Sequence, residues 1–279
     1  MTAAARKLRL ALAGAAAARA ALAGTAVLTA RPAGGPWRRT NYAGRPVTLL
    51  GGPALAASAT AVAVLGAPTG TRAAAALVGT VSGVVGGYDD LAGARPEQAA
   101  DKGLAGHLAA LRAGRVSAGA VKVAGIGAAA AAAAVLTRRG AGPGALVDGV
   151  LTTGLVAGTA NLLNLLDLRP GRAGKVGALV AAAGLGGPAG GLVAGPFGAT
   201  VATLPADLGE RVMLGDAGAN SLGALLGLRL ASIRGRAPRA GLLAGVVALT
   251  LVSEKVSFTK VIDATPGLRE LDRLGRRPS

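Results

Sequence analysis

Cysteine is absent from the sequence, which excludes disulfides, thiolate metal sites and a cysteine nucleophile. The single histidine, His107, excludes a metal site built from several imidazoles. Aromatic residues make up only 2% of the chain, so the tryptophan and tyrosine belts of many membrane proteins are nearly missing. Charged residues are 15% of the total, against about 25% in soluble domains, and 52% of the residues are hydrophobic. The composition therefore predicts an integral membrane protein.

Acidic residues are also scarce. There are 13 of them against 30 lysines and arginines, which gives a formal net charge of +17. Nucleic-acid binding would require a basic soluble face or aromatic stacking platforms, and the sequence shows neither. Basic loops at an anionic membrane surface, together with anionic substrates, explain the charge better. We therefore expect the lipid bilayer as a partner and no nucleic acid.

Apolar segments alternate with charged loops along the whole chain. This pattern predicts an all-α fold, in which residues 1–279 form a single integral-membrane domain built as a polytopic transmembrane helix bundle of about nine spans. The first span has an alternative interpretation as a secretory signal, because Arg6, Lys7 and Arg9 precede an Ala/Leu run, although Arg19 interrupts that run. The expected spans are about 8–30, 47–67, 72–88, 118–137, 144–166, 174–188, 189–205, 217–232 and 238–253, followed by a cytoplasmic tail, 254–279.

The distribution of lysine and arginine predicts the orientation. The more basic side comprises the loops that follow odd-numbered spans and the tail, so the N-terminus is expected outside and these loops in the cytoplasm. The arginine-rich segment 229–239 argues the other way. Parity is a stronger guide, because Asp89 and Asp90 end the third expected span, Asp167 ends the fifth, and the segment from Asp207 to Asp216 follows the seventh. These carboxylates must emerge on the same side, whichever way the protein is inserted.

A row of polar side chains ends the fifth expected span. Asn161, Asn164 and Asp167 follow one another at intervals of three, which on a helix places them on one face. Amide and carboxylate groups at the end of a membrane helix are costly unless they meet a partner or line a wet cavity. We therefore expect a polar ligand here. The loop that follows adds positive charge through Arg169, Arg172 and Lys175.

Two further motifs place carboxylates at helix ends. Asp89 and Asp90 are adjacent and point about 100° apart on a helix, so one can face a metal while the other faces a substrate proton or orients the first. Mg²⁺ prefers one or two carboxylates with waters and phosphate oxygens. Asp216 lies between Gly215 and Gly218, which allow close backbone approach, and it is expected either to cap the following helix or to bind a metal. A solvated helix end is the alternative interpretation of the Asp89–Asp90 pair.

Together these motifs resemble the polyprenyl-phosphate N-acetylhexosamine-1-phosphate transferase family, which includes phospho-N-acetylmuramoyl-pentapeptide transferase and the N-acetylglucosamine-1-phosphate transferases. The resemblance runs from about Asn41 to Asp216, and so covers most of the chain. The matching motifs are the loop from Asn41 through Gly44 and Arg45 to Gly51 and Gly52, the pair Asp89 and Asp90, the row Asn161, Asn164 and Asp167, and the segment Gly215 to Gly218.

This resemblance implies a Mg²⁺-dependent phosphoglycosyltransferase of the cell membrane, with Mn²⁺ as an alternative cofactor. Such an enzyme transfers a sugar 1-phosphate from a UDP-N-acetylhexosamine donor to a polyprenyl (undecaprenyl) phosphate acceptor, releasing UMP, in cell-envelope glycan synthesis. The resemblance implies that Asp216 and Asp90 bind the metal and that Asp89, Asp90 and Asp167 are catalytic, on the cytoplasmic face. The implied nucleotide and phosphate contacts are Asn161, Asn164, Arg45, Lys102, Arg169, Arg172 and Lys175.

The chain also departs from the family pattern. The second aspartate expected three residues after Asp167 is Pro170, the His-rich motif of the last cytoplasmic loop is absent, and no span follows the tail. A muramoyl-pentapeptide donor is therefore less favoured than another UDP-N-acetylhexosamine. These departures motivate an alternative, a catalytically inactive relative that acts as a lipid-carrier-binding or assembly protein. An ion-coupled transporter is less favoured, because its carboxylates would lie near mid-membrane. A homodimer is left open.

Overall fold

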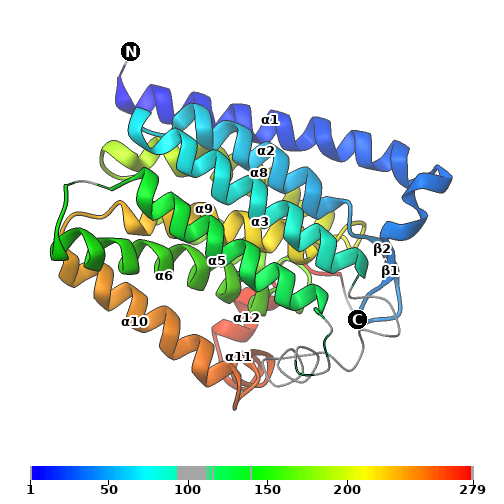
Figure 1. The fold of residues 1–279 in the computed structure, drawn as a ribbon. Coiled ribbons are helices and arrows are strands. Elements are labelled where there is room, and N and C mark those ends of the chain that lie inside the picture. The colour runs from blue at the N-terminus through cyan, green and yellow to red at the C-terminus, as the bar shows by residue number, and fades with distance from the viewer. Residues whose placement is uncertain (1, 93–111, 113, 115, 139, 278–279) are drawn as a thin grey trace.

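The structure, a computed structural model, describes residues 2–92, 112, 114, 116–138 and 140–277. Its helices form one elongated bundle (Figure 1). The α-helices are α1 (Ala3–Thr29), α2 (Gly51–Gly66), α3 (Arg72–Ala92), α5 (Ala118–Leu136), α6 (Pro143–Leu166), α7 (Arg172–Ala183), α8 (Gly191–Leu208), α9 (Gly215–Ala231), α10 (Arg236–Ser253), α11 (Phe258–Ala264) and α12 (Leu268–Arg273). The remaining elements are the 3-10 helices η1 (Pro32–Trp37), η2 (Thr69–Thr71) and η4 (Pro188–Gly190) and the strands β1 (Arg38–Thr40) and β2 (Pro46–Thr48).

Each apolar segment expected from the sequence forms a helix, so the all-α prediction is confirmed, with one short hairpin added. The expected number of nine membrane spans is wrong. Within the described residues, five helical segments are long and apolar enough to cross a membrane. They are α1, α5, α6, α10 and the segment Pro188–Leu208, which joins η4 to α8. These five segments are those of a multi-pass membrane protein.

The other expected spans fall short for physical reasons. The helices α7 and α2 have 12 and 16 residues. At 1.5 Å per residue they reach roughly 18 and 24 Å, less than the roughly 30 Å of a hydrocarbon core. The helix α9 has 17 residues, and α3, with 21, carries Arg72, Asp89 and Asp90. Apolar character in these helices reflects burial among other helices.

The helix α9 is the centre of the bundle. Every residue from Ala217 to Leu228 is buried, which is typical of a helix that is covered on all sides. The helices α2, α3 and α6 pack around it. At Gly86 the backbone of α3 approaches the carbonyl oxygen of Asp216 so closely that a Cβ would collide with it. Small residues at such contacts are typical of helix packing in membranes.

Two helices lie at the outer edges of the bundle (Figure 1). The helix α1 packs on α8 and α2, and α10 packs on α6. Each buries little of its surface, since only Gly14 and Ala18 of α1 and Val246 of α10 are buried. Their exposed apolar faces suit contact with lipid.

The short hairpin connects the first helix to the core. Its strands β1 and β2 pair antiparallel, with Arg39 opposite Val47. The turn between them is held by the Asn41 side chain, whose Oδ1 accepts the N–H groups of Ala43 and Arg45, each at 2.9 Å. The N–H of Met213 donates to the carbonyl of Thr48 at 2.8 Å, which fastens the hairpin to the loop before α9.

Candidate active site

The N-terminus of α9 brings together carboxylates from two other helices. Both oxygens of Asp90, near the end of α3, accept backbone N–H groups of α9, from Asp216 at 2.9 Å and from Ala217 at 3.0 Å. The carboxylate of Asp167, at the end of α6, accepts the N–H of Gly215. The positive end of the α9 dipole therefore faces Asp90 and Asp167. The convergence on one side that was expected from the parity of the spans is present.

This arrangement corrects one expectation for Asp216. The N-cap position of α9 is Leu214, which makes no side-chain capping bond, and Asp216 lies within the first turn. Asp216 therefore does not cap its own helix. Asp90 does so from a position 126 residues earlier in the chain. The Asp216 side chain is left to interact elsewhere.

Gly215 is required at the start of α9. Its φ of +55° lies in the left-handed region that side chains rarely adopt. A Cβ at this position would also lie 2.7 Å from Cδ2 of Leu49 and 2.8 Å from Oδ1 of Asp90. The glycine therefore lets the Asp90 carboxylate reach the helix end. The close backbone approach expected for the glycine beside Asp216 is present here.

The ammonium group of Lys122, on α5, lies between two of the predicted site residues. Its Nζ is 2.6 Å from Oδ2 of Asp89 and also pairs with Oδ2 of Asp216. The three side chains are largely buried, with 16% of Lys122, 16% of Asp89 and 24% of Asp216 exposed. Lys122 was not among the residues predicted from the sequence. A lysine inside the apolar segment 118–137 was the available signal, because ionisable groups within membrane helices usually mark functional or paired sites.

A carboxylate that parity places on this side, but that was not among the predicted site residues, lies beside Asp167. Asp207, in the last turn of α8, is buried and accepts the N–H of Gly171 at 3.0 Å. A cavity of about 30 Å³ between these residues has room for a water or an ion. Burial raises the pKa of Asp167 well above its usual value, and the charges of Asp207, Asp216 and Asp90 raise it further. The cavity is lined by Asn41, Tyr42, Asp167, Leu168, Arg169, Pro170, Asp207 and Met213.

The predicted phosphate contact Arg45 is engaged within the protein. Its Nη1 lies 2.8 Å from Oε1 of Glu210, a buried carboxylate in the loop before α9. The Nδ2 of Asn41 donates to the other oxygen of Glu210 at 2.5 Å. Glu210 has a φ of +53°, which is uncommon for a residue with a side chain. The hairpin is therefore held against the α8–α9 loop through Glu210, which was also not predicted from the sequence.

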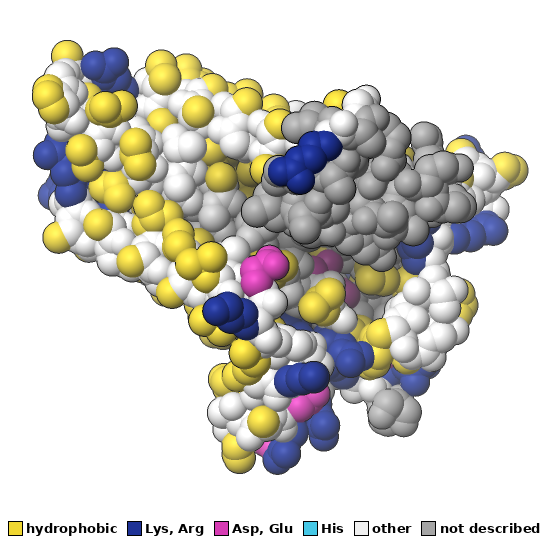
Figure 2. All heavy atoms as spheres, turned by 60° about the horizontal axis from the view of Figure 1, so that its bottom comes forward, with side chains coloured by type: hydrophobic (Ala, Val, Ile, Leu, Met, Phe, Trp, Pro, Cys, Tyr) yellow, Lys and Arg dark blue, Asp and Glu magenta, His cyan; other side chains and the backbone are white. Residues whose placement is uncertain are grey.

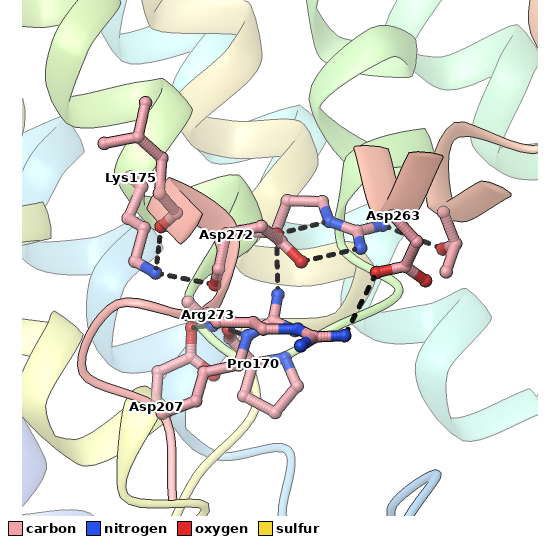
Figure 3. A network of polar contacts seen from close by, with 11 residues as sticks. Pro170, Lys175, Asp207, Asp263, Asp272 and Arg273 are labelled. Carbon is pink, nitrogen blue, oxygen red and sulfur yellow. Dashed lines mark hydrogen bonds and ion pairs between the residues drawn. The ribbon is translucent and has the colours of Figure 1, made fainter. Parts of the chain in front are cut away.

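Arg172, another predicted phosphate contact, is buried and bonds to Asp272 of the C-terminal segment. Figure 3 shows Asp272 in this network, close to Lys175. The Nε and Nη2 of Arg172 donate to the two carboxylate oxygens of Asp272, at 2.8 and 3.1 Å, and its Nη1 donates to Oγ1 of Thr259 at 3.0 Å. Arg276 donates to Oδ1 of Asp272 at 2.7 Å and to the carbonyl of Pro170 at 2.8 Å. The tail is thus fastened across the loop that joins α6 to α7.

The remaining predicted contacts lie around the same loop. Lys175 donates to the carbonyls of Leu271 and Asp272 at 2.9 and 2.8 Å, and the guanidinium of Arg169 stacks 4.0 Å from the centre of the Tyr42 ring. The side chains of Asn161 and Asn164 make no hydrogen bond to the part of the chain that the structure describes. Lys102 and His107 lie outside the described residues.

Charge of both signs is therefore concentrated at this end of the bundle. In Figure 2, dark blue basic side chains gather beside magenta acidic ones, while yellow apolar side chains cover the flank of the helices. No three histidine, aspartate or glutamate side chains of the described residues lie close enough together to hold a metal ion between them.

The sequence matches no protein-family model. A comparison with curated proteins also gives no match.

Proposed function

We propose that the protein transfers a sugar 1-phosphate from a UDP-N-acetylhexosamine to a polyprenyl (undecaprenyl) phosphate and releases UMP. The observation that carries this proposal is the convergence of Asp89, Asp90, Asp167 and Asp216 with Lys122 at the N-terminus of α9. These groups lie at one end of a bundle with five candidate membrane spans, where a lipid phosphate and a water-soluble nucleotide can meet. The family resemblance of the motifs supplies the reaction class.

The chemistry is the attack of one phosphate on another. An oxygen of the lipid phosphate bonds to the phosphorus that carries the sugar, and the bond from that phosphorus to the oxygen of the departing UMP breaks. Several negative charges are brought together, so positioning and charge neutralisation dominate the catalysis. The ammonium group of Lys122 and the N–H groups at the start of α9 supply positive charge at this point.

The residues present fit a Mg²⁺ site made of few protein ligands. Asp89 and Asp216 flank a single positive charge, the Nζ of Lys122, and Mg²⁺ commonly takes one or two carboxylates with waters and phosphate oxygens. The ion would supply charge neutralisation of the reacting phosphates when bound. Asp216, with Asp89 beside it, would hold the ion. Asp90, whose two oxygens already accept N–H groups, would orient the start of α9.

A turnover assay tests this proposal. Purified protein is mixed with polyprenyl phosphate, Mg²⁺ and a panel of UDP-sugars, and UMP release is measured. Asp216→Asn and Asp89→Asn should each abolish turnover with one of these donors. Asp263→Asn, an exposed aspartate at the same end of the bundle, is the matched control and should leave turnover unchanged. Full activity of Asp216→Asn would remove the proposed metal site.

Two observations favour a second candidate, a catalytically inactive relative that binds the lipid carrier. The guanidinium groups of Arg45 and Arg172, both predicted phosphate contacts, are paired with Glu210 and Asp272. Pro170 stands where the family has an aspartate. In this case the protein would bind polyprenyl phosphate with measurable affinity, yet release no UMP with any UDP-sugar. The same purified preparation distinguishes the two candidates.

A further inference from the structure

The end of the bundle opposite the carboxylate cluster contains a polar pocket of about 250 Å³. It is formed where the α2–α3, α5–α6 and α9–α10 connections meet. Arginine dominates its charge, and hydroxyl groups line much of the rest. The polar side chains that face it include Thr71, Thr137, Arg138, Asp148, Arg234 and Arg239.

An apolar groove of about 620 Å³ adjoins this pocket on the flank of the bundle, between α5 and α6. It is hollow because small residues line much of it, with Val135, Leu146 and Val150 as the larger apolar walls. Arg138 and Gly149 line both the groove and the pocket, so the two form one continuous site. An apolar groove that opens into a basic polar pocket suits an amphiphilic ligand.

The positive charge of the pocket exceeds its negative charge. Among the described residues that line it, Asp148 is the only acidic one, and it is already paired with Arg236 at 3.0 Å and with Arg239. Arg138 donates through Nε to the carbonyl of Gly140, and none of the described acidic residues pairs with it. Arg234 forms no ion pair with any residue that the structure describes. The pocket therefore carries a surplus of positive charge, which favours an anion.

We infer that this site binds an anionic membrane phospholipid, with the headgroup phosphate beside Arg138 and Arg234 and one acyl chain along the α5–α6 groove. Free phosphate would use only the pocket and leave the apolar groove without a ligand. A second copy of the chain packed in the groove would leave the arginines unneutralised. A phospholipid fits both parts of the site, because its phosphate neutralises the arginines of the pocket and its acyl chain fills the groove. The site lies toward the leaflet opposite the carboxylate cluster. This inference does not depend on the proposed function.

Lipid binding is tested by native mass spectrometry of the delipidated protein in detergent. Phosphatidylglycerol, phosphatidylcholine and inorganic phosphate are titrated separately, and the mass of each complex is measured. We expect one phosphatidylglycerol to bind well before phosphatidylcholine of the same chain length. Equal binding of the two lipids, or no binding of either, would overturn the inference, and so would binding of phosphate as tight as that of the lipid. A doubled protein mass without lipid would assign the groove to a second copy.

Two pairs of variants locate the site. Gly149→Leu places a side chain at the junction of groove and pocket, and a Cβ there meets no other atom within 4 Å, so the fold should tolerate it. Its matched control is Gly245→Leu on the exposed face of α10, where a Cβ likewise meets nothing. Only Gly149→Leu should abolish tight phosphatidylglycerol binding. If both variants bind the lipid equally, the groove is not the site.

The second pair tests the headgroup. Replacing Arg138 and Arg234 together by glutamine should weaken phosphatidylglycerol binding about 25-fold, or about fivefold for each charge removed near a membrane surface. Phosphatidylcholine binding should change little. Arg9→Gln, near the start of α1 at the same end of the bundle (Figure 1), is the control and should change neither. Unchanged selectivity in the double variant would refute the headgroup assignment.

Discussion

Replacing Asp272 by asparagine should release the C-terminal segment from the bundle without unfolding the bundle itself. The side chains of Arg172 and Asp272 are only 3% and 6% exposed, so the substitution leaves a buried guanidinium without its counter-charge. Removing one partner of a buried ion pair typically costs about 3–5 kcal/mol. Taking the lower value of about 3 kcal/mol, because Thr259 still accepts from Arg172, the open state of the tail should become roughly 150-fold more populated.

Hydrogen exchange measures this opening directly. Amides of α11 and α12 should exchange much faster in Asp272→Asn, while those of α9 should exchange at the wild-type rate. Asp263→Asn is the matched control in the same tail. The carboxylate of Asp263 pairs with Arg273 across 4.0 Å, and these side chains are 50% and 68% exposed. An exposed pair of this kind contributes about 0–1 kcal/mol, so exchange in the control should barely change.

The result that would refute this reasoning is equal exchange in the two variants. A double variant, Arg172→Met with Asp272→Leu, provides a further check. Buried ion pairs can often be replaced by apolar side chains of similar volume at little cost, so the double variant should recover most of the protection that Asp272→Asn loses. Continued fast exchange in the double variant would mean that the tail is held by other contacts.

Three further predictions concern the same end of the bundle. Gly215→Ala should lower the free energy of unfolding by about 1–3 kcal/mol, because the added Cβ would displace the Asp90 carboxylate. Gly245→Ala is the control and should leave the free energy of unfolding unchanged. Thermal unfolding in detergent measures both variants. Lys122→Met should abolish UMP release and lower the unfolding temperature, because it leaves Asp89 and Asp216 without their shared counter-charge. A variant that is active and as stable as the wild type would contradict this prediction. Burial acts to raise the pKa of Asp272, but hydrogen bonds and charge from the arginines beside it outweigh burial and hold the pKa below its usual value. Tail protection should therefore stay constant from about pH 8 to about pH 5 and be lost only in acid below about pH 4, as hydrogen exchange at each pH would show.

The helices were predictable because their signal is local. The expected segments 118–137 and 144–166 agree closely with α5 (Ala118–Leu136) and α6 (Pro143–Leu166). In each case a long apolar run is bounded by charge, glycine or proline. The expected segment 174–188 was placed less well, since α7 covers Arg172–Ala183 and the residues after it turn toward η4.

The candidate site was predictable only in part. The parity of the apolar segments was enough to predict that Asp89, Asp90, Asp167 and Asp216 lie at one end of the bundle, because parity depends only on the order of the helices. Their partners were not predictable. Lys122 is 94 residues from Asp216, and Asp272 is 100 residues from Arg172, so no sequence spacing connects them.

Hydropathy and helix order are properties of the chain alone, so they were enough to indicate an all-helical membrane protein with its carboxylates at one end. The folded arrangement was needed to show which apolar helices reach lipid and which, like α9, are enclosed by others. It was also needed to show which carboxylate caps α9 and which cation each acid meets. These pairs form between segments that are distant in the sequence and packed together in the fold. A buried acid there needs a cation or N–H donors beside it, because burying an unpaired charge is costly.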